Sequence, residues 1–425
     1  MITTPSIASP PPSGDRTRWH AFDSLRGLAA LSVVLCHLLW LGKSDTPLRT
    51  LYHAGVGPQA SADSWFAGLF AQARELPLMF FIESSPLHLF EAGHEAVILF
   101  YLLSGFVLYL GCERRQQHAY RAFLTKRVCR IYLPYLVALA IAIGFNATVV
   151  SGPLATMNGW FNQTWYVPVD WSQAFQHIFL VGSFNTNLFL MPSWTLVHEM
   201  RLSLVFPLLA AVVARTQGRW LLLLMAALSG AGIALDAMFS SLGNYFITLH
   251  YAAFFVAGAT IARQRGRCAR AYSSLRRPQR LAFLSAALLL YVYGRAVSVL
   301  TPLPAALADL PIAAGAILII LWSMSNPPVL YAGPVRWLGK VSYGLYLSHF
   351  SLCLASIHLL NGVLPLWAIL LIDLPLALGA AELFWRLVEA PAMQLGRRLT
   401  SLQPRLDQGV EVPGKPRMPV VQEGG

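Results

Sequence analysis

The sequence predicts an all-α, polytopic integral membrane protein with about ten transmembrane helices. Of its 425 residues, 56% are apolar and only 12% are charged, whereas soluble domains carry about 25% charged residues. The apolar residues form repeated runs of about 20, the length that crosses roughly 30 Å of hydrocarbon as a helix. This composition excludes a soluble globular enzyme, and five cysteines are too few for a disulfide-stabilised secreted scaffold.

Ten runs are long and apolar enough to be spans. In chain order they are residues 24–42, 94–111, 131–150, 190–213, 219–235, 245–262, 281–299, 308–325, 341–360 and 364–387. They define one membrane domain over residues 22–391. Residues 1–21 and 392–425 are rich in proline, glycine and polar residues, and we expect them to be disordered tails.

The positive charges are sorted by loop. If the N terminus is cytoplasmic, the outer loops hold only Lys43, Arg49, Arg74 and Arg295, and the inner loops hold the rest. This asymmetry follows the positive-inside rule and predicts a multi-pass protein of the inner (plasma) membrane with both termini in the cytoplasm. The net charge of +12 is therefore loop anchoring in contact with membrane lipid, and no nucleic-acid partner is expected.

Charged side chains at membrane depth are costly, so each one is a functional hypothesis. Arg26 and His37 lie eleven residues apart in the first span. On a helix this separation is a rise of about 16 Å with only about 20° between the two side chains around the axis. One face therefore carries an arginine near the cytoplasmic surface and a histidine in the outer third of the membrane.

Glu199 lies near the outer end of the fourth span, at a depth similar to that of His37. A carboxylate can orient an imidazole and stabilise its charged form, so the two are a plausible general base with its helper. The alternative is that each side chain only pairs with a neighbour inside the bundle.

Arg127 and Arg130 precede the third span and have the chemistry to bind phosphate oxygens, although they also suit a simple positive-inside anchor. In the ninth span Tyr343, Tyr346 and His349 recur every three residues and share a face, as a packing stripe or as part of a site. The sequence contains no CxxC, HExxH or P-loop lysine. We therefore expect no metal site and no permanently bound cofactor.

Several blocks in this order resemble the membrane-bound acyltransferase 3 family. They are Phe22-Asp-Ser-Leu-Arg-Gly-Leu-Ala-Ala with His37, Gly93-His-Glu-Ala-Val to Ser104-Gly-Phe, Lys126-Arg-Val-Cys-Arg-Ile-Tyr, Ser193-Trp-Thr-Leu-Val-His-Glu, Val341-Ser-Tyr-Gly-Leu-Tyr-Leu-Ser-His and Trp385-Arg-Leu-Val-Glu-Ala-Pro. Many members carry an acidic residue where this chain has Ile98, so no role is assigned there. Some relatives carry an esterase-like C-terminal domain, and we expect none in this protein.

The resemblance implies an O-acetyltransferase-like enzyme that transfers groups other than amino-acyl groups. It would move an acyl group, usually acetyl, from cytoplasmic acyl-CoA to a hydroxyl of an extracytoplasmic polysaccharide, lipopolysaccharide or glycolipid. His37 would be catalytic and Glu199 its helper. The coenzyme-binding residues would be Arg26, Arg127 and Arg130, and the expected substrate contacts are Trp194, Tyr346, His349, His94 and Glu95.

Two other classes of function stay open. A transporter or lipid flippase could use the buried histidine, glutamate and arginines as a relay, although the chain lacks the internal repeat typical of transporters. The second class is a catalytically silent scaffold of a polysaccharide export complex. The acceptor, the acyl chain length and the oligomeric state are left undetermined. The outer loops 43–93 and 151–189 should form the acceptor entrance, with four aromatics that suit either sugar stacking or the interfacial belt: Trp160, Trp165, Tyr166 and Trp171.

Overall fold

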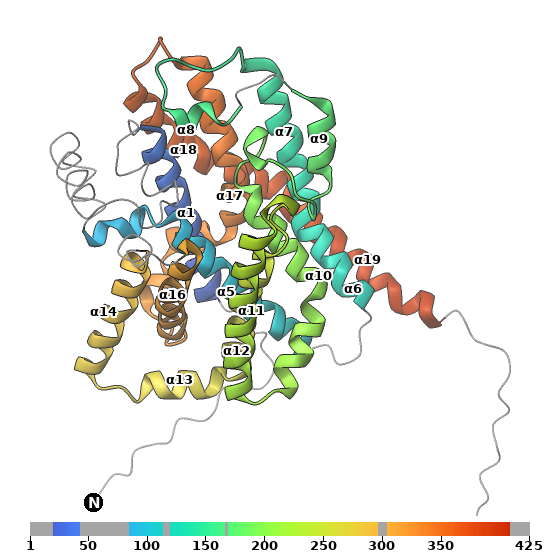
Figure 1. Ribbon diagram of the computed structural model, residues 1–425, viewed down its shortest axis with the longest axis vertical. Helices are drawn as coiled ribbons and strands as arrows, with labels where there is room; N and C mark the ends of the chain where they lie inside the picture. Colours follow the sequence, from blue (N-terminus) through green and yellow to red (C-terminus); the bar gives the residue numbers. More distant parts are fainter. Residues whose placement is uncertain (1–19, 43–84, 114–119, 166–168, 296–303, 409–425) are drawn as a thin grey trace, which may run out of the picture.

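The protein is an all-helical bundle in the computed structural model, which describes residues 20–42, 85–113, 120–165, 169–295 and 304–408 (Figure 1). These residues form no named strand, and eight of their helices are long and apolar enough to cross a membrane. The predicted fold class is confirmed. Residues 43–84, and with them most of the predicted entrance loop 43–93, lie outside the described residues.

Each of the ten predicted spans coincides with a helix or a continuous helical unit. These are α1 (His20–Gly42), α5 (Gly93–Glu113), the unit of α6 (Tyr120–Arg127), η2 (Val128–Tyr132) and α7 (Leu133–Val149), α10 (Ser193–Arg215), α11 (Gly218–Met238), α12 (Ile247–Arg263), α14 (Arg277–Tyr293), α16 (Asp309–Ser323), α17 (Gly333–Leu360) and α18 (Leu366–Phe384). The shortest single helices among these are α16, with 15 residues, and α12 and α14, with 17 residues each.

Shorter elements connect the spans. They are η1 (Pro86–Phe90), α8 (Gly159–Asn162), α9 (Trp171–Ile178), η3 (Thr186–Leu188), η4 (Ser240–Leu242), α13 (Arg265–Ser273), η5 (Ala305–Ala308) and η6 (Pro328–Tyr331). Helix α9 begins after Asp170, whose carboxylate accepts a hydrogen bond of 2.9 Å from the backbone N–H of Ser172. A hydrogen bond from the Gln173 side chain, together with this one from the Ser172 backbone, lowers the pKa of the Asp170 carboxyl below its ordinary value.

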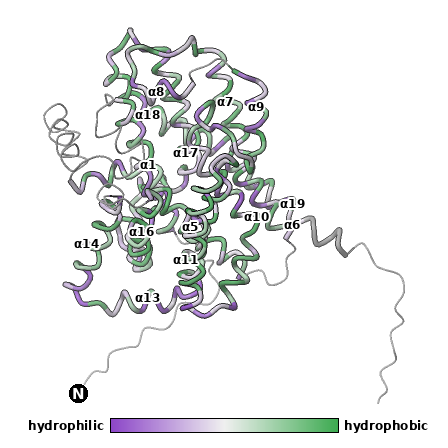
Figure 2. The backbone as a smooth tube through the Cα atoms, viewed as in Figure 1, coloured by the Kyte–Doolittle hydropathy of each residue, from purple (hydrophilic) through white to green (hydrophobic). Residues whose placement is uncertain are grey.

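Arginines gather where α12 ends and α13 begins, and we call the side of the bundle that carries Arg263, Arg265, Arg267 and Arg270 the arginine-rich side. Arg265 pairs with Glu113 at 3.0 Å, and Arg263 donates to the backbone carbonyls of Val213 and Thr216. The ends of α5, α10 and α12 therefore lie together. Figure 2 shows that the spans are largely hydrophobic along their lengths and that hydrophilic residues gather at the turns flanking α13.

The helix neighbours decide which side chains can meet. Helix α1 packs against α17, α5 and α18, whereas α10 packs against α12, α5 and α6. Helix α12 also packs on α5 and α11, and α16 packs on α5 and α14. Helix α17 packs on α7 and α18 as well as on α1. Since α1 and α17 form the most extensive of these contacts, the functional face of α1 is presented mainly to α17.

The close approach of α1 and α17 depends on glycine. A Cβ added at Gly27 would overlap the backbone of Gly339, and one added at Gly339 would overlap the backbone of Asp23. We therefore expect Gly27→Leu to force the two helices apart, because no side-chain movement relieves a clash with backbone, at a cost of about 3 kcal/mol or more. The measurement is the thermal midpoint of the purified protein in detergent.

Gly379→Leu in α18 is the matched control, because nothing lies within 4 Å of its added Cβ. An equal loss of stability in both variants would contradict the importance of the α1–α17 contact.

One tail prediction needs correction. Residues 392–408, expected to be disordered, belong to helix α19 (Ala390–Gln408), which continues from the π-helical η7 (Trp385–Glu389). Helix α19 packs on α6 and η2, where an added Cβ at Gly396 would lie 2.9 Å from the Cβ of Cys129. The low hydropathy of this stretch reflects a helix with one packed face, which composition alone does not distinguish from a tail. Residues 1–19 and 409–425 lie outside the described part of the chain.

Candidate active site

His37 of α1 is hydrogen-bonded to a second histidine from α17. Its Nδ1 lies 2.8 Å from Nε2 of His349, and the two rings are nearly parallel, with an interplanar angle of 8°. The Nδ1 of His349 lies 2.8 Å from the backbone carbonyl oxygen of Leu345, one helical turn earlier. His349 is completely buried, whereas His37 keeps partial exposure.

These hydrogen bonds fix the tautomers of both neutral rings. A carbonyl oxygen can only accept, so Nδ1 of His349 carries the proton and donates to Leu345. The Nε2 of His349 is then an acceptor, and Nδ1 of His37 must donate to it. The remaining nitrogen of His37, Nε2, has no hydrogen-bond partner in the part of the chain that the structure describes. It therefore presents a free lone pair, which is what a general base requires.

An aromatic wall surrounds His37. The Trp160 ring from α8 stacks on the imidazole with centroids 6.0 Å apart, and Phe350 lies 5.1 Å away at a tilt. Trp40 meets Trp160 edge to face at 5.4 Å. The Trp160 indole therefore lies directly beside His37, whose side chain is partly exposed.

The expected pairing of Glu199 with His37 is not formed, and His349 occupies that position. Oε1 of Glu199 instead accepts a hydrogen bond of 3.1 Å from the hydroxyl of Ser104 in α5. The sequence argument matched the depths of the two residues, but α1 and α10 are not close neighbours in the bundle. Depth along a helix therefore did not determine which side chains share a face.

The three predicted arginines do gather, and Glu199 lies with them. Arg26 and Arg127 each interact electrostatically with Glu199 and with Arg130. Within the described residues Arg26 and Arg127 have no hydrogen bond and no ion pair, while Arg130 donates only to the sulfur of Met393 at 3.7 Å. Asp23 also interacts electrostatically with Arg26, and Glu389 with Arg130. Guanidinium groups that have no ion pair within the described residues are suited to bind a multiply charged anion.

The aromatic face of α17 joins the arginines to the histidines. Tyr343 donates a hydrogen bond of 2.8 Å to the backbone of Ile131 in η2, the π-helical segment that carries Arg130. Tyr346, one turn further on, bonds the Thr195 hydroxyl at 2.7 Å, and its ring lies 6.3 Å from that of His349. The six steps from Tyr343 to His349 rise about 9 Å along the helix, so this face of α17 extends from the arginines to the histidines.

Three of the predicted substrate contacts lie elsewhere. Trp194 packs against the rings of His198 and Tyr251. Nε2 of His94 lies 2.6 Å from Asp309. Glu95 is buried at 2% exposure, with Oε1 unbonded and 4.0 Å from His88. No hydrogen bond or ring contact joins these three residues to His37 among the residues that the structure describes, whereas Tyr346 and His349 adjoin it directly or through one neighbour.

The other candidate aromatics have different surroundings. Trp165 is buried, and its indole N–H donates to the backbone of Phe189 at 2.9 Å. Trp171 is 71% exposed, and Tyr166 lies outside the described residues. Trp160 is therefore the member of this group that contacts the histidine pair.

Sequence reasoning missed two buried groups. Asp309 bonds His250 at 3.2 Å as well as His94, and His250 bonds Ser229 at 2.9 Å, so one network ties α5, α11, α12 and α16 together. Glu389 in η7, at 4% exposure, interacts electrostatically with Arg130. His250 and Asp309 both lie inside predicted spans, where an ionisable side chain is costly, so the sequence does carry a signal for this pair. In the described ranges no group of three or more histidine, cysteine or acidic side chains could hold a metal ion.

The fold and the site together define a polytopic α-helical membrane protein with a histidine pair and an arginine cluster joined through one helix face. The chain belongs to the acyltransferase 3 family, because the family model, described as an acyltransferase domain, matches residues 19–385. The protein is therefore a membrane acyltransferase. No curated protein and no solved structure matches it.

Proposed function

We propose that this acyltransferase moves an acetyl group from cytoplasmic acyl-CoA to a hydroxyl of an extracytoplasmic carbohydrate. The observation that carries the proposal is the tautomer of the histidine pair, which leaves Nε2 of His37 free to act as a base. The positive-inside orientation of the loops would place the inner arginines at the cytoplasmic surface of the inner (plasma) membrane. Both termini would then be cytoplasmic.

Arg26, Arg127 and Arg130 would hold the phosphates of the donor. Guanidinium groups bind phosphate bidentately, and the uncommitted Arg26 and Arg127 need no ion pair broken. The rise of about 16 Å from Arg26 to His37 is on the order of an extended pantetheine arm. The thioester would therefore reach the histidine pair along the Tyr343–His349 face of α17, without movement of the nucleotide part.

The chemical step is a direct transfer. Nε2 of His37 accepts the proton of the acceptor hydroxyl as the oxygen attacks the thioester carbonyl. The new C–O bond forms, the C–S bond breaks, and the proton returns from His37 to the coenzyme thiolate. Glu199, hydrogen-bonded to Ser104, would act further from the reacting atoms, where it balances the charge of the arginines.

The acceptor is proposed to be a carbohydrate because Trp160 lies beside the base. Apolar sugar faces stack on indole rings, and Trp40 supports the indole edge to face. We also propose Tyr346 as a substrate contact beside the histidine pair. An acceptor that extends beyond this pair would in addition contact Trp194, His94 and Glu95.

The test compares surface-glycan O-acyl content between the wild-type strain and a deletion strain by mass spectrometry, with labelled acyl-CoA supplied to membranes in vitro. The proposal expects the ester to be lost in the deletion strain and label to appear on glycan. A transporter or lipid flippase would instead keep its lipid movement without any acyl thioester.

A covalent acyl-histidine intermediate is the alternative to direct transfer. An acyl-protein adduct trapped by fast quench from labelled acyl-CoA would overturn the direct step. Normal product formation without such an adduct would support direct transfer.

His349 would position His37, so its replacement should lower turnover more than donor binding. We expect His349→Ala to reduce kcat about tenfold to a hundredfold with little change in the KM for acyl-CoA, because His37 loses its fixed tautomer. His349→Gln retains a side-chain acceptor and should recover part of the rate. Steady-state kinetics in membranes make the measurement, and a selective rise in KM would contradict a positioning role.

A further inference from the structure

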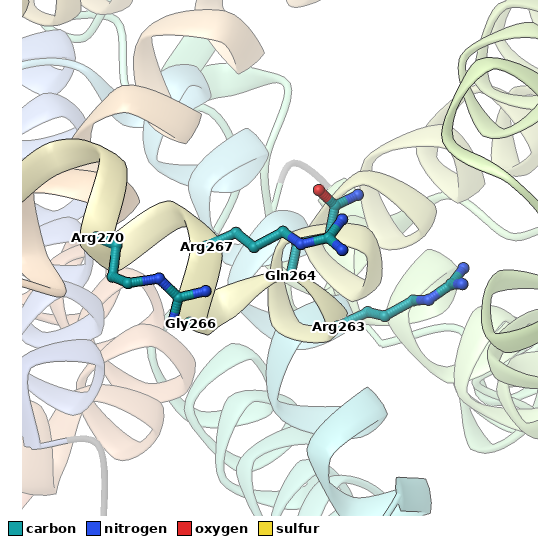
Figure 3. A pocket seen from close by; sticks show the side chains of 5 residues that line it. All are labelled: Arg263, Gln264, Gly266, Arg267 and Arg270. Atoms are coloured by element: carbon teal, nitrogen blue, oxygen red, sulfur yellow. The ribbon is translucent and has the colours of Figure 1, made fainter.

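A pocket on the arginine-rich side lies away from the histidine pair, at the turn between α12 and α13. It has a volume of about 340 Å³ and is lined by Arg263, Gln264, Gly266, Arg267 and Arg270. Figure 3 shows these side chains on the consecutive turns of chain where α12 ends and α13 begins. The lining holds three arginines and one amide and contains no carboxylate.

Two of the arginines have uncommitted charge. The guanidinium of Arg263 donates to the carbonyls that end α10, and the neighbouring Arg265 is paired with Glu113. Arg267 and Arg270 are exposed and have neither a hydrogen bond nor an ion pair with any described residue. The Arg270 side chain folds back toward Gly266, where an added Cβ would lie 3.6 Å from Nη1 of Arg270. Because glycine has no side chain, this position leaves room beside the Arg270 guanidinium.

The pocket lies where a lipid headgroup would be. Helix α13 connects the ends of two spans, α12 and α14 (Figure 1), and its Tyr272 is buried while Arg267 and Arg270 face outward. One face of α13 therefore packs on the bundle and the other carries free guanidinium groups at the level where the hydrophobic spans end. Basic pockets between helices at this depth suit the phosphates of anionic lipids.

We propose that this pocket binds the phosphate headgroup of an anionic membrane phospholipid, with Arg267 and Arg270 as the phosphate ligands. The donor nucleotide is the other source of phosphate on this side. None of the arginines assigned to the donor nucleotide lines this pocket. Arg127 and Arg130 belong to α6 and η2, which pack on α19, whereas α13 packs on α12 and α16. A free ligand-ready site therefore exists on a different part of the bundle from the one assigned to the donor.

The experiment measures lipid retention by native mass spectrometry of the full chain in detergent doped with dioleoyl phosphatidylglycerol or with dioleoyl phosphatidylcholine. We expect the wild type to retain phosphatidylglycerol selectively and the double variant Arg267→Gln with Arg270→Gln to bind it roughly thirtyfold more weakly. Arg276→Gln with Arg277→Gln is the matched control. It removes the same charge from exposed positions at the start of α14, which follow α13 in the chain and do not line the pocket.

Equal retention by the pocket variant and the control would overturn the proposal, as would equal loss in both, which reports surface charge alone. Acyl-CoA affinity is measured on the same samples. Loss of donor binding in the pocket variant, with phosphatidylglycerol retained, would assign the pocket to the nucleotide and overturn the lipid site. These readouts need no acyl transfer, so failure of the proposed reaction would leave the lipid test intact.

Discussion

His37→Ala is expected to reduce O-acylation of the surface carbohydrate by a hundredfold or more while the protein remains folded in the membrane. A positioned general base contributes about 10²–10⁴ in rate, and the fixed tautomer leaves Nε2 of His37 as the free base of the pair. The measurement is O-acyl content by mass spectrometry, together with protein abundance in membranes by immunoblot.

His20→Ala is the matched control, because His20 lies on the same helix α1, at its first residue. It should leave O-acylation at the wild-type level. Full O-acylation in the His37→Ala strain would remove the catalytic role and favour a silent scaffold of an export complex.

Arg127→Gln is expected to raise the KM for acyl-CoA about tenfold to a hundredfold and to change kcat less. A hydrogen bond to a charged group is worth about 1.5–3 kcal/mol, and each 1.4 kcal/mol is a factor of ten in affinity. Arg127 has no ion pair or hydrogen bond among the described residues, so its charge is available to the donor. Kinetics with varied acyl-CoA at saturating acceptor give both constants.

Arg121→Gln tests whether position matters beyond charge. Arg121 lies on the same helix α6 but is exposed, so its loss should leave the KM for the donor unchanged. If both variants raise the KM equally, the arginines act as a general positive surface, and the specific phosphate contact is wrong.

The spans were predictable because membrane crossing imposes a strong one-dimensional constraint. About 20 apolar residues are needed for each crossing, and all ten predicted runs coincide with helical segments. Helix α19 was not predictable in this way. Its residues from 392 onward are mostly polar, and the contact of Gly396 with Cys129 that helps to hold it in place joins positions far apart in the sequence.

The site was predicted in part. Arg26 and His37 share one helix, so their spacing followed from helix geometry alone. The arginines of α6 and η2 come from a different helix, and their proximity to Arg26 followed only from the resemblance. The partner of His37 was assigned to Glu199 because both lie at similar depth. The sequence places His349 in a stripe with Tyr343 and Tyr346, but a linear pattern does not say which helix that stripe faces.

By itself the sequence determined the fold class, the spans, the sorting of charges by loop and the residues that carry the family's blocks. The tertiary structure decided which helices are neighbours, and through them the histidine pair, the attachment of Glu199 to Ser104 and the place of Trp160 beside the base. The physical reason is that burial and charge act on each segment separately, so they are visible in sequence. Helix rotation and neighbour choice depend on side-chain packing between distant segments, including backbone contacts such as the one between Gly27 and Gly339.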